Sequence, residues 1–241
     1  MVMLLASPAI AGADEPVLNM DWLASGDPST PISFNPADVG DHVPGDDGST
    51  IFTGSLLGDT WDLAWTTRAR SDASGSYLDG VLSIINLSTT DDQSFSLETT
   101  LDVPNPFGDT ALFDLAASIA VTNLQWTGGA SLGTTGDAPI IEGRADSATI
   151  ASLFEPAYAL EALGPFGSAV DSAAMQALAD PMATIGLLTS FTLSPGDLVT
   201  MTYVLEVSPV PAPGAIALLL LAAASGRTRR RRAPAQDENA P

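Results

Sequence analysis

The feature that most restricts the fold is a run of residues that alternate between apolar and polar. Between Gln93 and Val103 the odd positions carry Phe95, Leu97, Thr99, Leu101 and Val103, and the even positions carry Ser94, Ser96, Glu98, Thr100 and Asp102. Alternation with a period of two is typical of a β-strand that buries one face and exposes the other. The run therefore predicts a sheet that packs one face against a core.

Further segments repeat this pattern. Alternating or β-branched and aromatic runs occur at Trp61, Leu63 and Trp65, at 77–87, at the odd positions of 113–121, at 190–193 and at 199–207. The apolar phase changes near Asn123, where Leu124 and Trp126 take even positions, which predicts a β-bulge or a bend between sheets. The turn-forming sequence Ser194-Pro195-Gly196-Asp197 separates the last two runs and predicts a closing hairpin.

These strands predict an all-β fold, an antiparallel β-sandwich or jelly roll, in a single domain at 14–208. Two stretches interrupt the strands. The proline- and glycine-rich part from Asp27 to Ser49 is predicted to be a loop. The alanine-rich part from Glu155 to Asp180 predicts a short helix capped near Ser168, which would bury Met175 and Leu178. A chain of this length can bury a core without disulfides, and it contains no cysteine.

The charge of the predicted domain is strongly negative. Of the 29 acidic residues, 27 lie in 14–208, where the basic residues are only Arg68, Arg70 and Arg144 and lysine is absent, so the net charge there is −24. Such a surface repels nucleic acid and anionic lipid, which excludes both as partners of the domain. A saline or calcium-rich habitat and a merely soluble acidic surface explain this charge equally well.

Residues that could carry catalysis are few. His42 is the only histidine, it lies in a polar stretch, and we predict that it is solvated. The sequence has no Gly-x-Ser-x-Gly motif, and no pair of carboxylates stands out from the others. We therefore predict a protein that is not an enzyme.

Two weaker binding signals remain. Asp38, Asp41, Asp46 and Asp47 form a cluster that could bind calcium through carboxylate and carbonyl oxygens, although turn formation is the commoner use of such residues. Among the tryptophans, Trp61, Trp65 and Trp126 share the phase of buried residues and predict core packing. Trp22 lies in a polar context and is the candidate for a surface role.

The C-terminal segment at 209–241 has three parts in a fixed order. A hinge, Pro211, Ala212, Pro213 and Gly214, precedes an apolar run of Ala215, Ile216, Ala217, Leu218, Leu219, Leu220 and Leu221, and a basic cluster of Arg227, Arg229, Arg230, Arg231 and Arg232 follows. Two prolines so close together end the preceding domain, and the run favours a helix. The arginines would hold their end of that helix in the cytoplasm.

This order of hinge, apolar run and arginines resembles the PEP-CTERM sorting signal of bacterial exosortase substrates. The usual Pro-Glu-Pro reads Pro211-Ala212-Pro213 here, and residues 233–241 extend past the arginines. The resemblance implies transient membrane anchoring, processing by an exosortase-type enzyme, and an association with exopolysaccharide. A plain C-terminal membrane anchor is the alternative, but the run is shorter than the roughly 20 apolar residues of a stable span.

The N-terminal residues 1–13 look like the end of a secretory signal. They are apolar, and small residues at Ala9, Ala11 and Ala13 fit the cleavage rule, whereas the basic start of such a signal is absent. We therefore expect a signal remnant whose natural start lies upstream of Met1, and a mature chain that begins between Gly12 and Asp14.

Two functional hypotheses follow. The first is an exported surface or extracellular-matrix protein without catalytic activity, resident in the cell envelope or secreted. The second is a carbohydrate-binding β-sandwich with a defined glycan site. A shallow aromatic-lined groove on one sheet would favour the second hypothesis, and a smooth acidic surface would favour the first.

Overall fold

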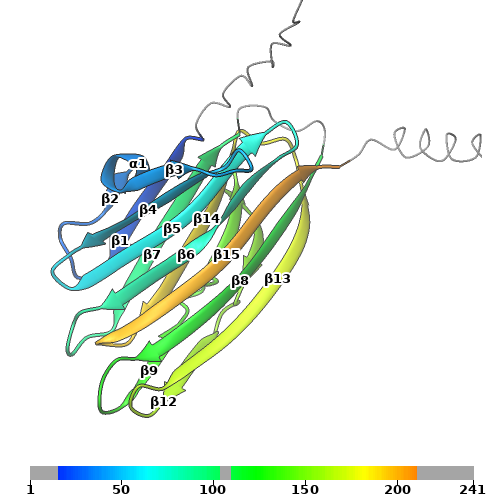
Figure 1. Ribbon diagram of the computed structural model, residues 1–241. Coiled ribbons are helices and arrows are strands. Elements are labelled where there is room, and N and C mark those ends of the chain that lie inside the picture. Colours follow the sequence, from blue (N-terminus) through cyan, green and yellow to red (C-terminus); the bar gives the residue numbers. More distant parts are fainter. Residues whose placement is uncertain (1–15, 104–109, 211–241) are drawn as a thin grey trace, which may run out of the picture. The chain divides into compact units, whose positions relative to one another are not determined.

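The structure is a computed structural model that describes residues 16–103 and 110–210. In these residues the strands form two antiparallel sheets that face each other (Figure 1). The predicted all-β sandwich is thus confirmed. The predicted signal remnant at 1–13, the sorting motif, the apolar helix and the arginine cluster lie outside the described residues.

The first sheet, called the eight-stranded sheet, contains the strand predicted most clearly by the alternation. Its strand order is β11 (Ala148–Leu153), β10 (Ile141–Ala145), β14 (Thr184–Leu193), β7 (Gln93–Asp102), β1 (Leu18–Ala24) and β2 (Ile32–Phe34), with β9 (Gly129–Gly133) beside β14 and β12 (Ala159–Leu163) beside β9.

The second sheet, called the seven-stranded sheet, faces the viewer in Figure 1. Its order is β13 (Ser168–Ala179), β8 (Ala111–Asn123), β15 (Asp197–Pro209), β6 (Gly75–Asn86), β5 (Trp61–Asp72), β4 (Thr50–Leu57) and β3 (Asp41–Pro44). One helical turn, α1 (Pro36–Val39), precedes β3, and the Asn35 side chain caps it by accepting a bond from the Ala37 amide. The stretch predicted as a loop therefore contains β2, α1 and β3.

The core lies between the sheets, where apolar side chains of both inner faces meet. The odd residues of β7 are buried as predicted, and so are Trp61 and Trp65 on β5. Trp22 contradicts its prediction, because it is fully buried and stacks on Phe95 with ring centroids 5.5 Å apart. Its strand β1 pairs with β7, which places Trp22 opposite Leu97 on the inner face, whereas its neighbours Asp21 and Leu23 lie on the outer face.

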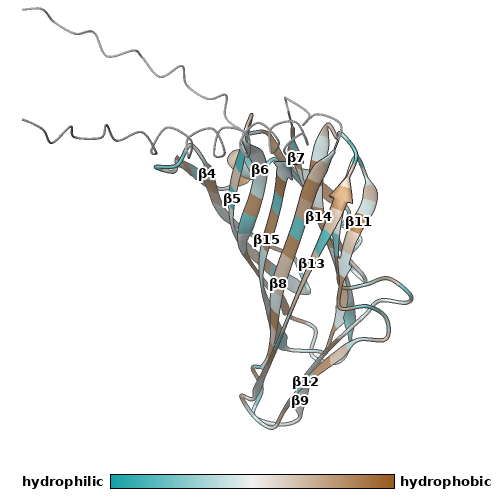
Figure 2. Ribbon diagram, turned by 90° about the vertical axis from the view of Figure 1, so that its right-hand side faces the viewer, coloured by the Kyte–Doolittle hydropathy of each residue, from teal (hydrophilic) through white to brown (hydrophobic). Residues whose placement is uncertain are grey.

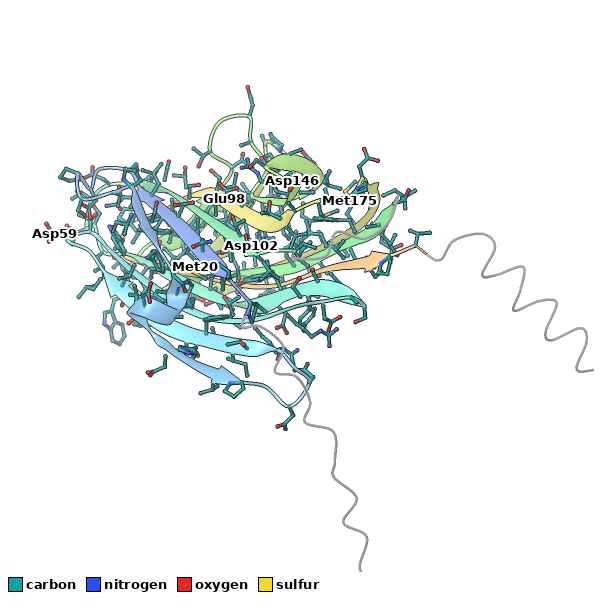
Figure 3. All side chains as sticks on the ribbon, turned by 90° about the horizontal axis from the view of Figure 1, so that it is seen from above. Met20, Asp59, Glu98, Asp102, Asp146 and Met175 are labelled. Atoms are coloured by element: carbon teal, nitrogen blue, oxygen red, sulfur yellow. The ribbon has the colours of Figure 1, made fainter. Side chains whose placement is uncertain are left out.

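The predicted short helix in 155–180 is wrong. Residues Ser168–Ala179 form β13, and all twelve pair in register with β8. Met175 and Leu178 are exposed rather than buried, and Figure 3 labels Met175 on this strand. The continuous ladder of backbone hydrogen bonds to β8 outweighs the weak helix preference of the alanines, since propensity is a small term that tertiary pairing overrides.

The predicted closing hairpin is also wrong, because β14 and β15 lie in different sheets. β14 pairs with β7 and β10, whereas β15 pairs with β6 and β8. The turn at Ser194-Pro195-Gly196 is real, and Gly196 adopts a positive φ of 70° there. It carries the chain from one sheet to the other, which places Asp197 in the interior with its carboxylate accepting a bond from the Ser194 hydroxyl.

The change of phase near Asn123 marks the end of β8, where the chain passes from the seven-stranded sheet to β9 in the eight-stranded sheet, so the predicted bend between sheets is confirmed and the bulge is wrong. Asn123 is the last residue of the strand, and Leu124 and Trp126 follow in the loop to β9. Trp126 is 80% exposed, so its predicted place in the core is wrong. Once the strand has ended, alternation no longer determines which side chains are buried.

Asp197 provides a test of the interior of the sandwich. Burial raises the pKa of this carboxyl above its ordinary value of 3.8, so the folded protein binds this proton more readily than the unfolded chain does. Stability then falls as the pH rises through the interval between the two pKa values. We expect the melting temperature of Asp197→Asn, relative to the wild type, to be higher at about pH 7 than at about pH 4. A difference that is constant with pH, or larger in acid, would contradict this expectation.

Candidate binding groove

The outward face of the seven-stranded sheet carries cross-strand rows of side chains, two of which matter here. Neighbouring strands lie about 4.8 Å apart, so each row repeats at that interval. The first row, called the hydroxyl row, contains Thr53, Thr66, Val81, Thr202, Ser118 and Ser172. The second row contains Ile51, Arg68, Asp79, Val204, Ala116 and Ala174. Most of these side chains are small, so the sheet can be approached closely from outside.

A groove of about 810 Å³ lies over these two rows and runs from β4 to β13 across the strands. Four hydroxyl groups of the hydroxyl row line it, those of Thr66, Thr202, Ser118 and Ser172. Val81, Val204 and the alanines supply small apolar surface between them. The groove is open to solvent. Figure 2, which looks onto the β13 edge, shows hydrophobic and hydrophilic residues in alternation along the strands of this sheet.

Arg68 is held by several hydrogen bonds at the β5–β6 part of the groove. Its guanidinium donates two bonds of 3.0 Å to the Asp79 carboxylate, and one of 2.6 Å to the Tyr77 hydroxyl. The cation also lies over the Tyr77 ring, 5.1 Å from its centroid. These bonds raise the pKa of Arg68 above its already high ordinary value, and burial raises the pKa of Tyr77. The guanidinium balances the Asp79 carboxylate, so the pair adds little net charge to this part of the groove.

The floor of the groove requires a glycine at one point. A Cβ at Gly80 would clash with the Thr66 carbonyl oxygen and would lie 2.9 Å from the Tyr203 hydroxyl. That hydroxyl is buried beneath the groove, 2.8 Å from the Thr67 hydroxyl, and burial raises the pKa of Tyr203. The pair satisfies two buried polar groups, so it stabilises the floor rather than facing a ligand.

The residues predicted to bind calcium do not come together. Asp38 lies in α1, Asp41 begins β3, and Asp46 and Asp47 follow that strand. Within 16–103 and 110–210, no three acidic or histidine side chains are close enough to hold a metal ion. Asp47 instead accepts bonds from the hydroxyl and amide of Ser49, and these lower its pKa. That bonding is the turn-forming use of aspartate.

The predicted sorting residues at 211–232 lie outside the described residues. In the part of the chain that the structure describes, no helix is sufficiently long and apolar to cross a membrane. His42, predicted to be solvated, is exposed on β3, where its ring lies 6.2 Å from that of Phe52.

One exposed aromatic pair was not predicted from the sequence. Trp126 and Phe166 pack edge to face with ring centroids 4.7 Å apart. They come from the β8–β9 and β12–β13 loops, which Asn123 ties together by donating from its side chain to the Gly164 carbonyl. The glycines at 128–129 beside Trp126 were the one available signal that the strand had already ended.

No protein-family model matches the chain, and no curated protein sequence does. Among solved structures, TmCBM61 in complex with beta-1,4-galactotriose matches 61% of this chain and 88% of its own chain, with a TM-score of 0.25 and 9% sequence identity. A likeness of this strength carries no argument about the ligand or the activity of the present protein.

Proposed function

We propose that this chain is an exported surface protein without catalytic activity, whose sandwich binds a neutral glycan chain in the groove. The observation that supports glycan binding best is the hydroxyl row, which lines the groove with Thr66, Thr202, Ser118 and Ser172. Each hydroxyl can donate one hydrogen bond and accept two, which suits a ligand made of hydroxyl and ether oxygens.

The shape and charge of the groove favour an extended and uncharged ligand. The five strand spacings from β4 to β13 amount to about 24 Å, the length of an oligomer rather than of a single sugar. The small side chains of Val81, Val204 and Ala116 leave room for a ring to lie flat, with its C–H face on apolar surface. An anionic polymer would be repelled, because the domain at 14–208 carries a net charge of −24.

The groove is suited to binding rather than hydrolysis. Glycosidases generally use two carboxylates at the scissile bond. Among the residues that line the groove, Asp79 alone is acidic, and its carboxylate is held by Arg68. No second carboxylate stands opposite it in the lining.

The export part of the proposal depends on the two ends of the sequence. The signal-like residues 1–13 and the hinge, apolar run and arginines of 209–241 support secretion, transient anchoring and processing by an exosortase-type enzyme. Exopolysaccharide, which the sorting-signal resemblance implies, would place a glycan polymer where the groove could bind it.

A groove-filling substitution tests glycan binding. We expect Ala116→Trp to weaken binding of a neutral polysaccharide by at least about tenfold, because the indole would occupy the middle of the groove floor. Affinity electrophoresis against a panel of soluble neutral polysaccharides, including the polymer of the native host, gives the comparison.

The matched control is Thr122→Trp, on the same outward face of β8 but six residues away and outside the groove lining, about 20 Å along the strand. It should bind like the wild type. Wild-type protein that binds none of the polysaccharides, or two variants that lose binding equally, would refute the proposed site.

A further inference from the structure

The edge strands of the two described sheets differ greatly in length and in the residues that oppose pairing with another strand. β2 has three residues, β12 five and β11 six, and β3 has four, which include Pro44 and the charged Asp41. Proteins commonly keep edge strands short, or place charges and prolines there, because unpaired backbone groups attract another strand. These edges follow that rule.

β13 does not follow it. The strand has twelve residues, all in register with β8, and among the described residues no strand pairs with its other edge. Figure 1 shows it at the margin of the seven-stranded sheet. It contains no proline, no basic residue and a single acidic one, Asp171, whose carboxylate accepts a bond of 2.9 Å from Tyr158. Asp171 is thus the one residue of the strand whose charge opposes pairing at this edge.

We propose that two copies of this chain associate by antiparallel pairing of β13 with β13 across a two-fold axis at Ala174. Such an interface uses the same surface on both copies, and the two seven-stranded sheets would become one. This proposal is independent of glycan binding. If both hold, the two grooves meet end to end, because the groove reaches β13 at Ser172 and Ala174.

The side chains of β13 match their own copy in this register. An axis at Ala174 places Val170 opposite the partner's Leu178, which are 65% and 67% exposed in the single chain, and Ser172 opposite the partner's Gln176. Pairing would cover the apolar pair and join polar with polar. An axis at Ala173 would instead place Val170 opposite Gln176.

Charge opposes a second copy less at this edge than over the rest of the domain. The rest of the domain is strongly acidic, so two copies repel each other over most of their surfaces. In the proposed register Asp171 lies opposite Ala177, and the two Asp171 carboxylates are six positions apart, about 20 Å along the strands. β13 therefore offers a long edge where this repulsion is small.

Cysteine cross-linking tests the interface and its register, because the chain has no cysteine of its own. Residues directly opposite in an antiparallel pair have Cα atoms about 4.5–5.5 Å apart, within the range of a disulfide. We expect Ala174→Cys in the full 241-residue chain to form a covalent dimer under mild oxidation. Val81→Cys, exposed on the same face but on the inner strand β6, should not.

Mixing supplies a second readout of the register. Val170→Cys and Leu178→Cys should each cross-link poorly alone and should form a heterodimer when combined. Equal cross-linking of Ala174→Cys and Val81→Cys would overturn the proposal, and so would Ala174→Cys that stays monomeric. Cross-linking of Ala174→Cys without the Val170–Leu178 heterodimer would overturn the register.

A charge substitution measures the interface without a covalent bond. Ala174→Asp brings two carboxylates together at the axis and should weaken dimerisation at least about tenfold in analytical ultracentrifugation. The side chain is exposed, so the variant should fold. Ala116→Asp, in the same row but on the inner strand β8, is the control and should dimerise like the wild type. Association that Ala174→Asp leaves unchanged would arise from another surface and would refute the pairing.

Discussion

Leu97→Asp is expected to unfold the sandwich. Leu97 lies on β7, a central strand paired with β1 on one side and β14 on the other, and its side chain is 1% exposed. An aspartate there would bury a carboxylate that has no partner, or would have to remain protonated at a free-energy cost. We expect a loss of more than about 4 kcal/mol in the free energy of unfolding, well beyond the usual effect of a point mutation. Urea or thermal unfolding followed by circular dichroism measures it.

The adjacent residue provides the matched control. Ser96→Asp introduces the same side chain on the opposite face of the same strand, where Ser96 is partly exposed, so it should change stability little. Glu98 is less suitable, because its carboxylate accepts a bond of 3.1 Å from Arg144. Equal melting temperatures for Leu97→Asp and Ser96→Asp would show that the inner and outer faces of β7 had been assigned wrongly.

Processing is expected to remove the C-terminal apolar run from all of the mature protein. If 209–241 is a sorting signal, mature protein from the native host lacks the apolar run and ends near Pro211 to Pro213. Replacing Arg229–Arg232 with glutamine removes the charge that holds the cytoplasmic end, so we expect unprocessed or mislocalised protein. Intact mass spectrometry of surface-released and membrane fractions distinguishes these forms.

The sandwich serves as the internal control in this experiment. β15 ends at Pro209, before the hinge, so the circular dichroism spectrum of the arginine variant should show the same folded domain. Mature wild-type protein that still ends at Pro241 would exclude processing and would leave the plain membrane anchor as the explanation of this segment.

Local pattern predicted the parts of the fold that depend on one strand at a time. The alternation in 93–103 correctly identified both β7 and its buried face, because period-two geometry is a property of any extended chain. The apolar phase near Trp126 gave a wrong prediction, because Trp126 lies beyond the last residue of β8. The polar context of Trp22 led to a wrong prediction, because Trp22 is buried on β1, which pairs with β7. Leu18, Met20 and Trp22 alternate with Asn19 and Asp21, so the period-two pattern was present at β1 and by itself indicated the burial of Trp22.

The candidate site could not be predicted from the sequence, because it depends on how distant strands pair. The four hydroxyl residues of the groove are far apart in the sequence, and Thr66 and Thr202 are separated by 136 positions. They lie in one row because their strands β5, β15, β8 and β13 belong to one sheet, and the residues are Thr66, Thr202, Ser118 and Ser172. None of them belongs to a motif, and each is an ordinary outward residue of its own strand. Hydroxyl groups become a binding surface only when strand order and register align them.

By itself the sequence determined the all-β class, the faces of the most regular strands and the strongly acidic character of the domain, because each follows from composition or from local geometry. Only the tertiary structure decided that β14 and β15 enter different sheets, that Ser168–Ala179 is a long edge strand rather than a helix, and that small side chains line a groove. The physical reason is that backbone hydrogen bonds between distant segments satisfy the same groups in many arrangements. The packing of the whole core selects one of them.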